Sequence, residues 1–279
     1  PHRAIGKLPP LRYYLDNFVT NPQKSNMYWT LTRACHHPPR VLISNSSMGK
    51  LTFLGTKGEI EEETARHRFH PSLLVESGRT RLLIDYGLLH RYSLDEIAPD
   101  AVLITHAHPD HYSWLKQDVQ SSIPVYLTQE TLDYGKFKPQ NSRVIAPMEK
   151  FKLGAFECMA YRVIHSIHCP AVGWKLTFEG KTLVYNSDLV DIVEKDAVLA
   201  GVDYYVGDGS AVKANLVRRR GDVLFGHTRI ITQIHWCQKF GIKHIIFTHL
   251  GRETLRDEEN FKAEHPEVVF AYDGLKMEI

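Results

Sequence analysis

The 279-residue chain has few cysteines, and no two of them stand at a short, regular spacing. The four are Cys35, Cys158, Cys169 and Cys237. A disulfide-stapled secreted scaffold is therefore not predicted, and a reduced setting is the simplest interpretation. The sequence also has no apolar run of membrane-spanning length and no apolar stretch near its start that resembles a signal peptide. We therefore expect a cytoplasmic protein that does not enter a membrane.

An excess of charge of one sign is also missing. The chain has 34 Lys and Arg residues against 32 Asp and Glu residues, a net charge of +2. This balance neither indicates nor excludes a nucleic-acid partner. Hydrophobic residues make up 43% of the chain, which is ordinary for a globular protein with a large core.

Residues 1–47 differ in character from the remainder. They hold six basic residues and one acid, a net charge of +5, whereas residues 48–279 have a net charge of −3. They hold Pro9-Pro10, Pro22 and Pro38-Pro39, and they show no sustained hydrophobic period. We interpret them as an atypical N-terminal extension. It is either a non-native segment ahead of a start at Met48, or a basic arm that contacts substrate or the partner subunit of a homodimer.

The densest group of metal-ligand side chains lies in Thr105–His111, with the sequence THAHPDH. The apolar run Ala101–Ile104 directly before it predicts a buried strand, which would deliver the group to a loop. Imidazole and carboxylate suit zinc and related metals. Three histidines and one aspartate in a single loop exceed the needs of one ordinary catalytic site. We therefore expect two metal ions side by side.

Three further candidate ligands each follow a short apolar run. They are His165, Asp188 and His249. Such runs predict strands, so each of these residues is expected where a strand ends. Ligands at the ends of several strands can converge at one edge of a sheet, where they would complete a two-metal site.

This ordered series, His-x-His-x-Asp-His followed by His, Asp and His, resembles the metallo-β-lactamase superfamily of binuclear metal hydrolases. The segments Leu51–Thr56 and Leu82–Gly87 also resemble that family's opening strands. The resemblance extends from about Gly49 to the C-terminus. It implies an α/β fold, the four-layer αβ/βα sandwich of two mixed β-sheets flanked by helices, with residues 48–279 as the hydrolase domain. The sequence pattern alone supports α/β but not this topology.

The resemblance also implies a role for each candidate ligand. The first metal would be held by His106, His108 and His165, the second by Asp110, His111 and His249, and both by a bridging Asp188. A hydroxide between the metals would be the nucleophile, and Asp110 would count among the catalytic residues. Zinc is the expected metal, and manganese, iron, nickel or cobalt fit the same residues.

One ligand is ambiguous, because His165 and His168 lie only three residues apart. The family pattern places this histidine a few residues before a glycine, here Gly173. The segment His165-Ser166-Ile167 resembles the version found in nuclease-like members. We therefore predict that His165 is the ligand and that His168 is a neighbour of the ligands or part of the pocket wall.

From Gly49 onward, strand-like and helical patterns alternate. The expected strands are Leu51–Gly55, Ser72–Glu76, Arg81–Asp85, Ala101–Ile104, Pro124–Leu127, Phe156–Ile164, Gly173–Phe178, Lys181–Tyr185, Asp203–Val206, His244–Thr248 and Val268–Tyr272. The expected helices are Ser113–Gln120, Gln129–Gly135, Arg229–Phe240 and Glu253–Glu264. Gly180 predicts a hairpin turn, and Gly241 a helix end.

The segment Phe225–Arg229, with the sequence FGHTR, bears on the substrate. It resembles the Gly-His-Ser/Thr segment of the tRNA 3′-processing endonucleases and related phosphodiesterases, in which the histidine protonates the leaving oxygen. The resemblance assigns this role to His227 and assigns Asp208 as the carboxylate that orients it. The plainer alternatives are that His227 only neighbours a helix cap, for which Thr228 is the expected residue, and that Asp208 only forms a turn.

Basic residues surround this segment. They are Lys213, Arg218, Arg219, Arg220 and Arg229, and Arg252 follows further along the chain. A cationic wall would suit a phosphate diester, whereas a solvated loop is the plainer explanation. We take Lys213, Arg229 and Arg252 as candidates for contacts with a substrate phosphate.

We therefore predict a binuclear metal-dependent phosphodiesterase. Only 23 residues separate His165 from Asp188, and no long Gly/Pro-rich arm for gripping tRNA is visible. A small phosphate ester is thus the expected substrate, with nucleic acid as a second class. The alternatives are a non-catalytic metal or redox module and a carboxyl-ester, lactone or thioester hydrolase. The latter would need an apolar pocket, for which the candidate lining residues are Tyr86, Tyr112, Trp114 and Trp174.

Overall fold

The computed structural model of the protein describes residues 48–279. Our interpretation of residues 1–47 and the position of Cys35 lie outside the described residues. Within residues 48–279 the chain forms two large β-sheets, a separate two-stranded ribbon and five α-helices.

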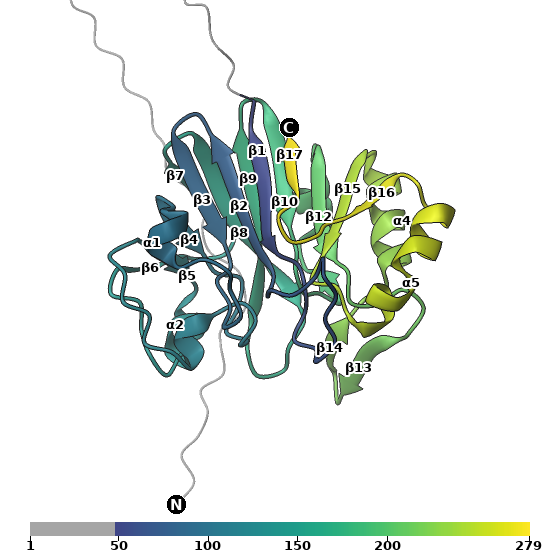
Figure 1. Ribbon diagram of the computed structural model, residues 1–279, viewed down its shortest axis with the longest axis horizontal. Coiled ribbons are helices and arrows are strands. Elements are labelled where there is room, and N and C mark those ends of the chain that lie inside the picture. Colours follow the sequence, from purple (N-terminus) through teal and green to yellow (C-terminus); the bar gives the residue numbers. More distant parts are fainter. Residues whose placement is uncertain (1–47) are drawn as a thin grey trace, which may run out of the picture. The chain divides into compact units, whose positions relative to one another are not determined.

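The first sheet comes from the beginning of the described chain and from its last strand (Figure 1). Its seven strands lie in the order β17-β1-β2-β3-β4-β5-β6. They are β1 (Lys50–Gly55), β2 (Ser72–Ser77), β3 (Thr80–Ile84), β4 (Ala101–Leu103), β5 (Val125–Leu127), β6 (Ser142–Val144) and β17 (Lys276–Glu278). Strands β17 to β3 pair antiparallel and β3 to β6 pair parallel, so the sheet is mixed.

The second sheet is mixed as well. Its main path runs β11-β8-β9-β10-β12-β15-β16, and β7 pairs with β8 beside that path. The strands are β7 (Lys150–Leu153), β8 (Phe156–Ile164), β9 (Ala171–Phe178), β10 (Lys181–Tyr185), β11 (Asp191–Ile192), β12 (Tyr204–Asp208), β15 (His244–Thr248) and β16 (Val268–Phe270). Strands β10, β12, β15 and β16 run parallel to one another.

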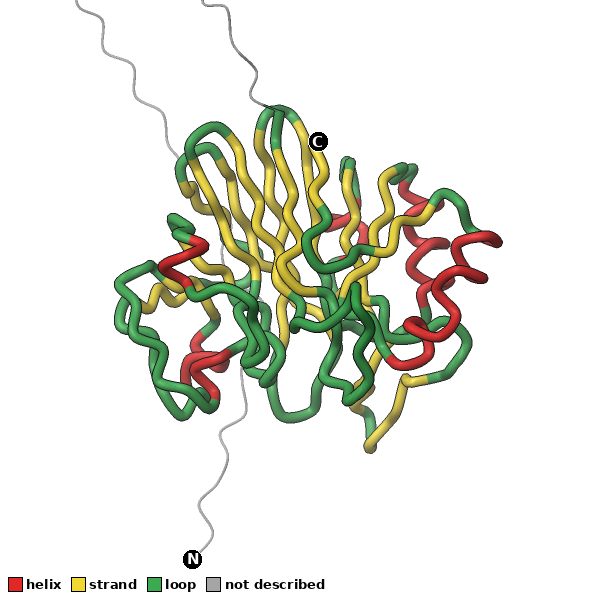
Figure 2. The backbone as a smooth tube through the Cα atoms, viewed as in Figure 1, coloured by secondary structure: helices red, strands yellow, loops and turns green. Residues whose placement is uncertain are grey.

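The helices lie on the two outer sides, with the strands between them (Figure 2). They are α1 (Leu94–Ile97), α2 (Gln129–Tyr134), α3 (Lys195–Leu199), α4 (Ile230–Phe240) and α5 (Arg252–Glu264). Strands β13 (Leu216–Arg220) and β14 (Val223–His227) form the separate ribbon. No helix in the described part of the chain has the length and apolar character that a membrane crossing requires.

Strand alternation explains the layers, because successive side chains of a strand point to opposite faces. In β3, Leu82 and Ile84 join the core between the two sheets, whereas Leu83 joins the core on the helix side. In β15, Ile246 faces the other sheet, and Phe247 packs in the cluster that includes α4 and α5. Apolar clusters therefore lie on both faces of each sheet. The expected four-layer α/β sandwich is confirmed.

The expected helix over Ser113–Gln120 is wrong. Only Ser113–Leu115 forms a helical turn, and it is of the 3₁₀ type. The Ser113 N–H donates to the Tyr86 carbonyl over 2.8 Å, and its Oγ donates to the Gly87 carbonyl over 2.7 Å. The segment is thereby tied to the chain that follows β3, and it does not extend into an α-helix.

Two glycine predictions are confirmed by the backbone. Gly180 has φ +75° in the turn between β9 and β10, and Gly241 has φ +70° where it caps α4. Both lie in the left-handed region that favours glycine. Thr228, expected to cap α4, does not do so. The cap residue is Arg229, without a side-chain hydrogen bond, and the Thr228 N–H is held by the Leu189 carbonyl.

Candidate metal centre

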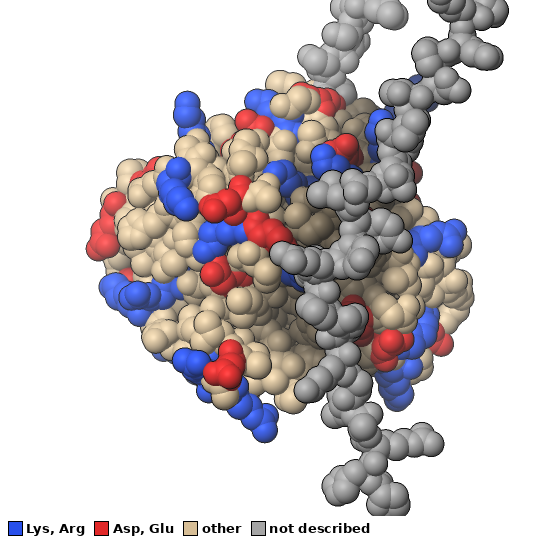
Figure 3. Space-filling view, turned by 180° about the vertical axis from the view of Figure 1, so that it is seen from behind, with Lys and Arg blue, Asp and Glu red and all other residues tan. Residues whose placement is uncertain are grey.

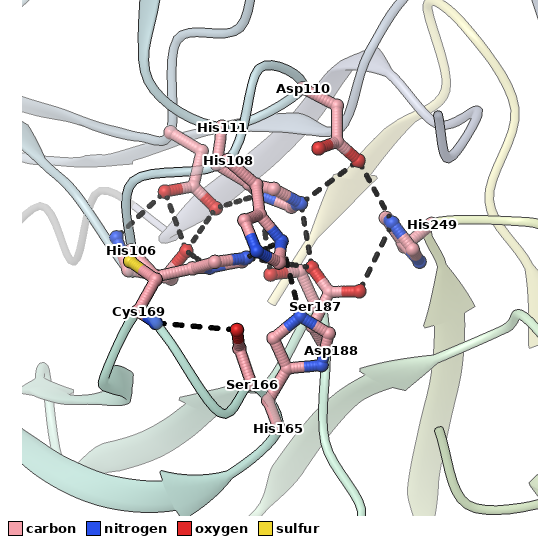
Figure 4. A network of polar contacts seen from close by, with 12 residues as sticks. His106, His108, Asp110, His111, His165, Ser166, Cys169, Ser187, Asp188 and His249 are labelled. Atoms are coloured by element: carbon pink, nitrogen blue, oxygen red, sulfur yellow. Dashed lines mark hydrogen bonds and ion pairs between the residues drawn. The ribbon is translucent and has the colours of Figure 1, made fainter. Parts of the chain in front are cut away.

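The candidate ligands come from both sheets and meet where strands end (Figure 4). Thr105–His111 follows β4 of the first sheet, while His165, Asp188 and His249 follow β8, β10 and β15 of the second. The sequence prediction that each of these residues lies beyond a strand is therefore confirmed.

A first group consists of three histidines, His106, His108 and His165. The His108 Nδ1 lies 2.9 Å from His106 Nε2 and 3.2 Å from His165 Nε2. Burial lowers the pKa of His165 to about 4 and holds the pKa of His106 well below its usual range. Neutral imidazoles have a lone pair to donate, so this group has the character of a metal site.

A second group consists of Asp110, His111, Asp188 and His249, all of them buried. The Asp110 Oδ2 lies 3.1 Å from His111 Nε2 and 3.0 Å from His249 Nε2. Two carboxylates and two imidazoles thus point at one position. Carboxylate oxygen and imidazole nitrogen together favour a divalent metal such as zinc.

Asp188 connects the two groups. Its Oδ2 lies 2.6 Å from His111 Nε2 in the second group and 3.6 Å from His106 Nε2 in the first. Its Oδ1 lies 3.1 Å from His249 Nε2. Burial would raise the pKa of this carboxyl, but His249, His111 and His165 hold it well below its usual range. An ionised carboxylate between two groups of imidazoles has the placement of a bridging ligand.

The ligand rings are fixed by partners on their other nitrogens. The His111 Nδ1 lies 2.8 Å from the Asp85 carboxylate, and the Asp85 oxygens also accept from Thr105. The His249 Nδ1 lies 2.7 Å from Ser210 Oγ. Such partners set the tautomer and the angle of a ring that binds metal. Asp85 and Ser210 were not predicted as site residues. The signal for Asp85 was its place directly after the apolar run Leu82–Ile84.

Three atoms of this centre are buried without a hydrogen bond. They are Nε2 of His111 and both carboxylate oxygens of Asp188. Buried polar atoms without a hydrogen bond are costly, so these three atoms call for another group between them. Because these atoms belong to the second group and to the connecting carboxylate, the residues fit divalent metal ions.

His168 takes no part in the first group. It is exposed, and its backbone N–H bonds to the Ser166 Oγ over 3.4 Å. His165 Nδ1 instead lies 3.1 Å from the Gly226 carbonyl, which leaves Nε2 directed at His108. Of the two alternatives that the sequence left open, the structure places His165 with the ligands. The neighbouring Cys169 is buried, and its sulfur accepts the Ala107 N–H of the ligand loop.

A second carboxylate–histidine pair borders the ligands. His227 Nδ1 lies 2.8 Å from Asp208 Oδ2 and 3.3 Å from Asp188 Oδ1. Asp208 is fully buried, and its carboxylate also accepts the N–H groups of Leu189 and Ser210. Asp208 ends β12 and His227 ends β14, so two separate strands bring the pair together.

The pair is strongly coupled electrostatically. Burial disfavours the charged form of His227, but the Asp208 and Asp188 carboxylates outweigh it and raise the pKa of the imidazole. Burial acts on Asp208 in the opposite sense, yet His227 and His249 lower the pKa of its carboxyl to about 2. Asp208 is therefore ionised at any ordinary pH and favours a protonated His227.

A cavity of about 750 Å³ opens onto this centre. Its floor includes Asp188 and His227, and its wall includes Lys213 and Arg252. The Lys213 Nζ lies 3.3 Å from the Asp257 carboxylate, and Arg252 pairs with Glu62. These two candidate phosphate contacts thus already have acidic partners.

The other predicted basic residues do not line the cavity. Arg229 is exposed at the start of α4, and the run Arg218–Arg220 lies on the ribbon of β13 and β14. The predicted cationic wall therefore does not form a single surface. Its members lie in the loop before β13, on β13, at the start of α4 and at the start of α5, and those at the cavity are already paired.

Comparisons with known proteins agree with this geometry. The family model described as "Beta-lactamase superfamily domain" matches residues 83–250, more than half of the chain. Ribonuclease Z of Methanopyrus kandleri is 24% identical over 82% of this chain and 97% of its own length.

Solved structures show the same fold. The metallo-beta-lactamase fold protein YhfI from Bacillus subtilis matches with a TM-score of 0.62 and 19% identity, over 83% of this chain and all of that chain. Human tRNase Z, short form, matches with a TM-score of 0.59 and 16% identity, over 82% of this chain and 99% of that chain. With the family model covering the ligand-bearing segments, the chain belongs to the metallo-β-lactamase superfamily of metal-dependent hydrolases.

Proposed function

We propose that this protein is a phosphodiesterase that works with two divalent metal ions. The observation that carries the proposal is the meeting of three features at one cavity: the two ligand groups, the connecting carboxylate of Asp188, and the pair of His227 with Asp208. The ligand groups suit the attack on an ester, and the pair suits the departure of its leaving group.

The seven predicted ligands would hold two metals, one at each ligand group, and Asp188 would be shared between the two groups. When bound, divalent ions at these positions would supply Lewis acidity and lower the pKa of a coordinated water. Zinc is the expected metal on the basis of the ligands, and other borderline metals fit as well. Asp85, Ser210 and the Gly226 carbonyl keep the ligand rings in place.

His227 would act as the proton donor. Its Nδ1 is held by Asp208, which leaves Nε2 as the nitrogen available to a substrate in the cavity. Because the Asp208 carboxylate raises the pKa of His227, it favours the protonated ring, which has a proton to give. An alkoxide leaving from a phosphate diester is a poor leaving group, so it benefits from this proton more than a phenolate does.

The comparisons support phosphate-ester chemistry. Two of the relatives bear names that refer to ribonuclease Z or tRNase Z activity. Those names describe proteins that act on nucleic acid. For this chain we propose the hydrolysis of phosphate diesters. We also propose zinc as the metal and the cytoplasm as the place where the protein acts. A homodimer stays a prediction.

The carboxyl-ester alternative has less support. Tyr86, Tyr112, Trp114 and Trp174, which were to line its apolar pocket, are at most 2% exposed and belong to the hydrophobic cores. None of the four lines the cavity at the candidate centre. The cavity lining instead carries charged side chains of both signs.

The test compares turnover of bis-p-nitrophenyl phosphate with turnover of p-nitrophenyl acetate and a lactone, on purified protein with measured metal content. We expect a strong preference for the phosphodiester. In His227→Ala, the metal content should persist while turnover falls by roughly 10²- to 10⁴-fold with alkyl leaving groups, and less with p-nitrophenolate.

His235→Ala is the matched control, because this histidine is exposed on α4 and does not line the cavity. It should behave as the unaltered protein. A preference for the carboxyl ester or the lactone that does not depend on His227 would contradict the proposal.

A further inference from the structure

The ribbon of β13 and β14 is set apart from both sheets. It projects beyond them at the lower end of the view in Figure 1 and forms its own two-stranded sheet. Its outer part is exposed, from Arg218 to Leu224. Isolated two-stranded hairpins have little stability of their own, so a projecting hairpin with an exposed tip is not explained by packing.

Two faces of this hairpin differ in character. Directly opposed residues of an antiparallel pair lie on the same face, and the faces alternate along each strand. The register pairs Leu216 with His227, Arg218 with Phe225, and Arg220 with Val223. These six residues therefore share one face. The intervening pairs, which include Arg219 opposite Leu224, occupy the other face.

The first face continues the candidate active site. At its inner end, His227 lies 3.3 Å from Asp188, and both His227 and Leu216 line the cavity. Further out on the same face, Phe225 stands opposite Arg218, and Arg220 lies beyond them opposite Val223. The face thus leads from the proposed proton donor to an aromatic ring beside one exposed cation, and then to a second exposed cation.

The root of the hairpin is firmly held. The Gly226 N–H donates to the His165 carbonyl over 2.7 Å, and the Gly226 carbonyl accepts from the His165 ring. The loop before β13 is fixed by Glu253, whose carboxylate accepts the N–H groups of Val212, Lys213 and Ala214. The inner end is therefore placed accurately relative to the ligands.

The three arginines are not equivalent. Arg219 lies on the other face, opposite Leu224. It donates to the Gly221 carbonyl and pairs with Asp222 at 3.1 Å. Arg218 and Arg220 have no ion-pair partner among residues 48–279. In Figure 3, basic side chains stand at the lowest part of the described surface, where the hairpin projects. The two arginines on the His227 face are thus the ones available to an anion.

We propose that this face binds the chain of a single-stranded nucleic acid on the leaving-group side of the scissile phosphate. At about 3.3 Å per residue, Val223 and Arg220 lie roughly 13 Å from His227 along the strand. A small diester in the cavity does not reach them, whereas a polynucleotide does. Arginine matches backbone phosphates and an aromatic side chain offers a surface for a base.

This inference rests on the proposed phosphodiesterase function and names its substrate class. The short interval between His165 and Asp188 favoured a small ester on sequence grounds. The hairpin supplies a binding element elsewhere in the chain, beyond Asp208, where the sequence left a cationic wall and a solvated basic loop as alternatives.

The test uses the full chain with its measured metal content. The variant Arg218→Gln/Arg220→Gln is assayed on RNA and DNA strands of two and ten nucleotides and on bis-p-nitrophenyl phosphate. We expect kcat/KM on the ten-nucleotide strand to fall roughly tenfold through KM, with kcat unchanged. Activity on the dinucleotide and on bis-p-nitrophenyl phosphate should persist. The slope of log(kcat/KM) against log[salt] should become shallower by about 0.7 for each lost contact.

Arg219→Gln is the matched control on the opposite face, and Lys239→Gln/Lys243→Gln removes the same charge from the surface near α4. Both should retain full activity on the long strand. Equal losses in all three variants would show a nonspecific charge effect. Equal losses on long and small substrates would show that the arginines act by placing His227. Either result overturns the inference.

The two proposals fail separately. If the unaltered protein cleaves none of the phosphodiesters, the proposed function is wrong. If it cleaves bis-p-nitrophenyl phosphate but does not prefer the ten-nucleotide strand to the dinucleotide, the function stands and the nucleic-acid inference is wrong.

Discussion

The floor and the wall of the cavity differ in how deeply their side chains are buried and in how firmly they are held. On the floor, the ligand side chains are nearly all buried, and the rings of His111, His165 and His249 each have a second partner that fixes them. On the wall, Lys213 and Arg252 are exposed and pair with half-buried acids. The floor is therefore organised before any ligand arrives, whereas the wall is adaptable.

The same contrast predicts how strongly a substitution in each region affects stability and activity. A buried charge that loses its partner is strongly destabilised, whereas an exposed pair contributes little because water replaces it. Substitutions on the floor should therefore have large effects, and substitutions on the wall small ones. Four predictions test this contrast in order of decreasing effect.

The largest effect is expected from Asp188→Ala. Asp188 connects both ligand groups, so its removal should lower the metal content from two ions to one or none and reduce turnover to background. Elemental analysis of the purified variant measures this. Asp191→Ala is the control, because Asp191 lies three residues away and pairs with the surface residue Lys195. Retention of two metal ions in Asp188→Ala would refute the ligand set.

A nearly equal effect is expected from His165→Ala, and none from His168→Ala. His165 directs Nε2 at the first group, whereas His168 is exposed and contacts Ser166 only through its backbone. Metal titration by calorimetry should show the first site lost in one variant and intact in the other. Loss of metal in His168→Ala alone would reverse the assignment.

An intermediate effect is expected from Asp208→Asn. The amide keeps the shape but removes the charge that raises the pKa of His227, so turnover should fall by about 10²-fold while the metals remain. A proton donor fails as pH rises through its pKa. A lower pKa for His227 should therefore move the alkaline limb of the kcat profile to lower pH. An unshifted alkaline limb would show that Asp208 has only a structural role.

The smallest effects are expected on the wall. Lys213→Gln and Arg252→Gln should each change kcat/KM for bis-p-nitrophenyl phosphate within about a factor of three, because each cation already has an acidic partner. Glu62→Gln is the informative counterpart, since it frees Arg252 and Arg256 and should lower KM for anionic substrates. A large loss in Arg252→Gln would mean that substrate displaces Glu62.

The contrast also explains how much could be predicted from the sequence. The segment Thr105–His111 places four ligands in one loop, so local spacing was sufficient to identify it. His165, Asp188 and His249 are far apart in the chain, yet each follows a buried strand whose apolar run is visible. These strands were predicted to within a few residues, because burial on both faces leaves a continuous apolar signal.

The elements and contacts that the sequence did not predict share a different cause. The strands β6, β7, β11, β13, β14 and β17 and the helices α1 and α3 are short, and several are exposed, so their apolar pattern is weak. The pairing of Lys213 with Asp257 and of Arg252 with Glu62 depends on tertiary neighbours. Sequence spacing does not reveal such neighbours. The run of arginines was visible, but its division between two faces required the register of β13 and β14.

Gly226 marks the boundary between the fixed inner end of the hairpin and its exposed tip. Its φ of +105° and the 2.1 Å between an added Cβ and the Leu216 carbonyl oxygen exclude any larger residue without rearrangement. On one side of it lie the rings of His165 and His227, and on the other an exposed tip that contacts neither. If the hairpin binds substrate as proposed, changes at its tip would alter which polymer it accepts, while Gly226 would keep the rings of His165 and His227 in place.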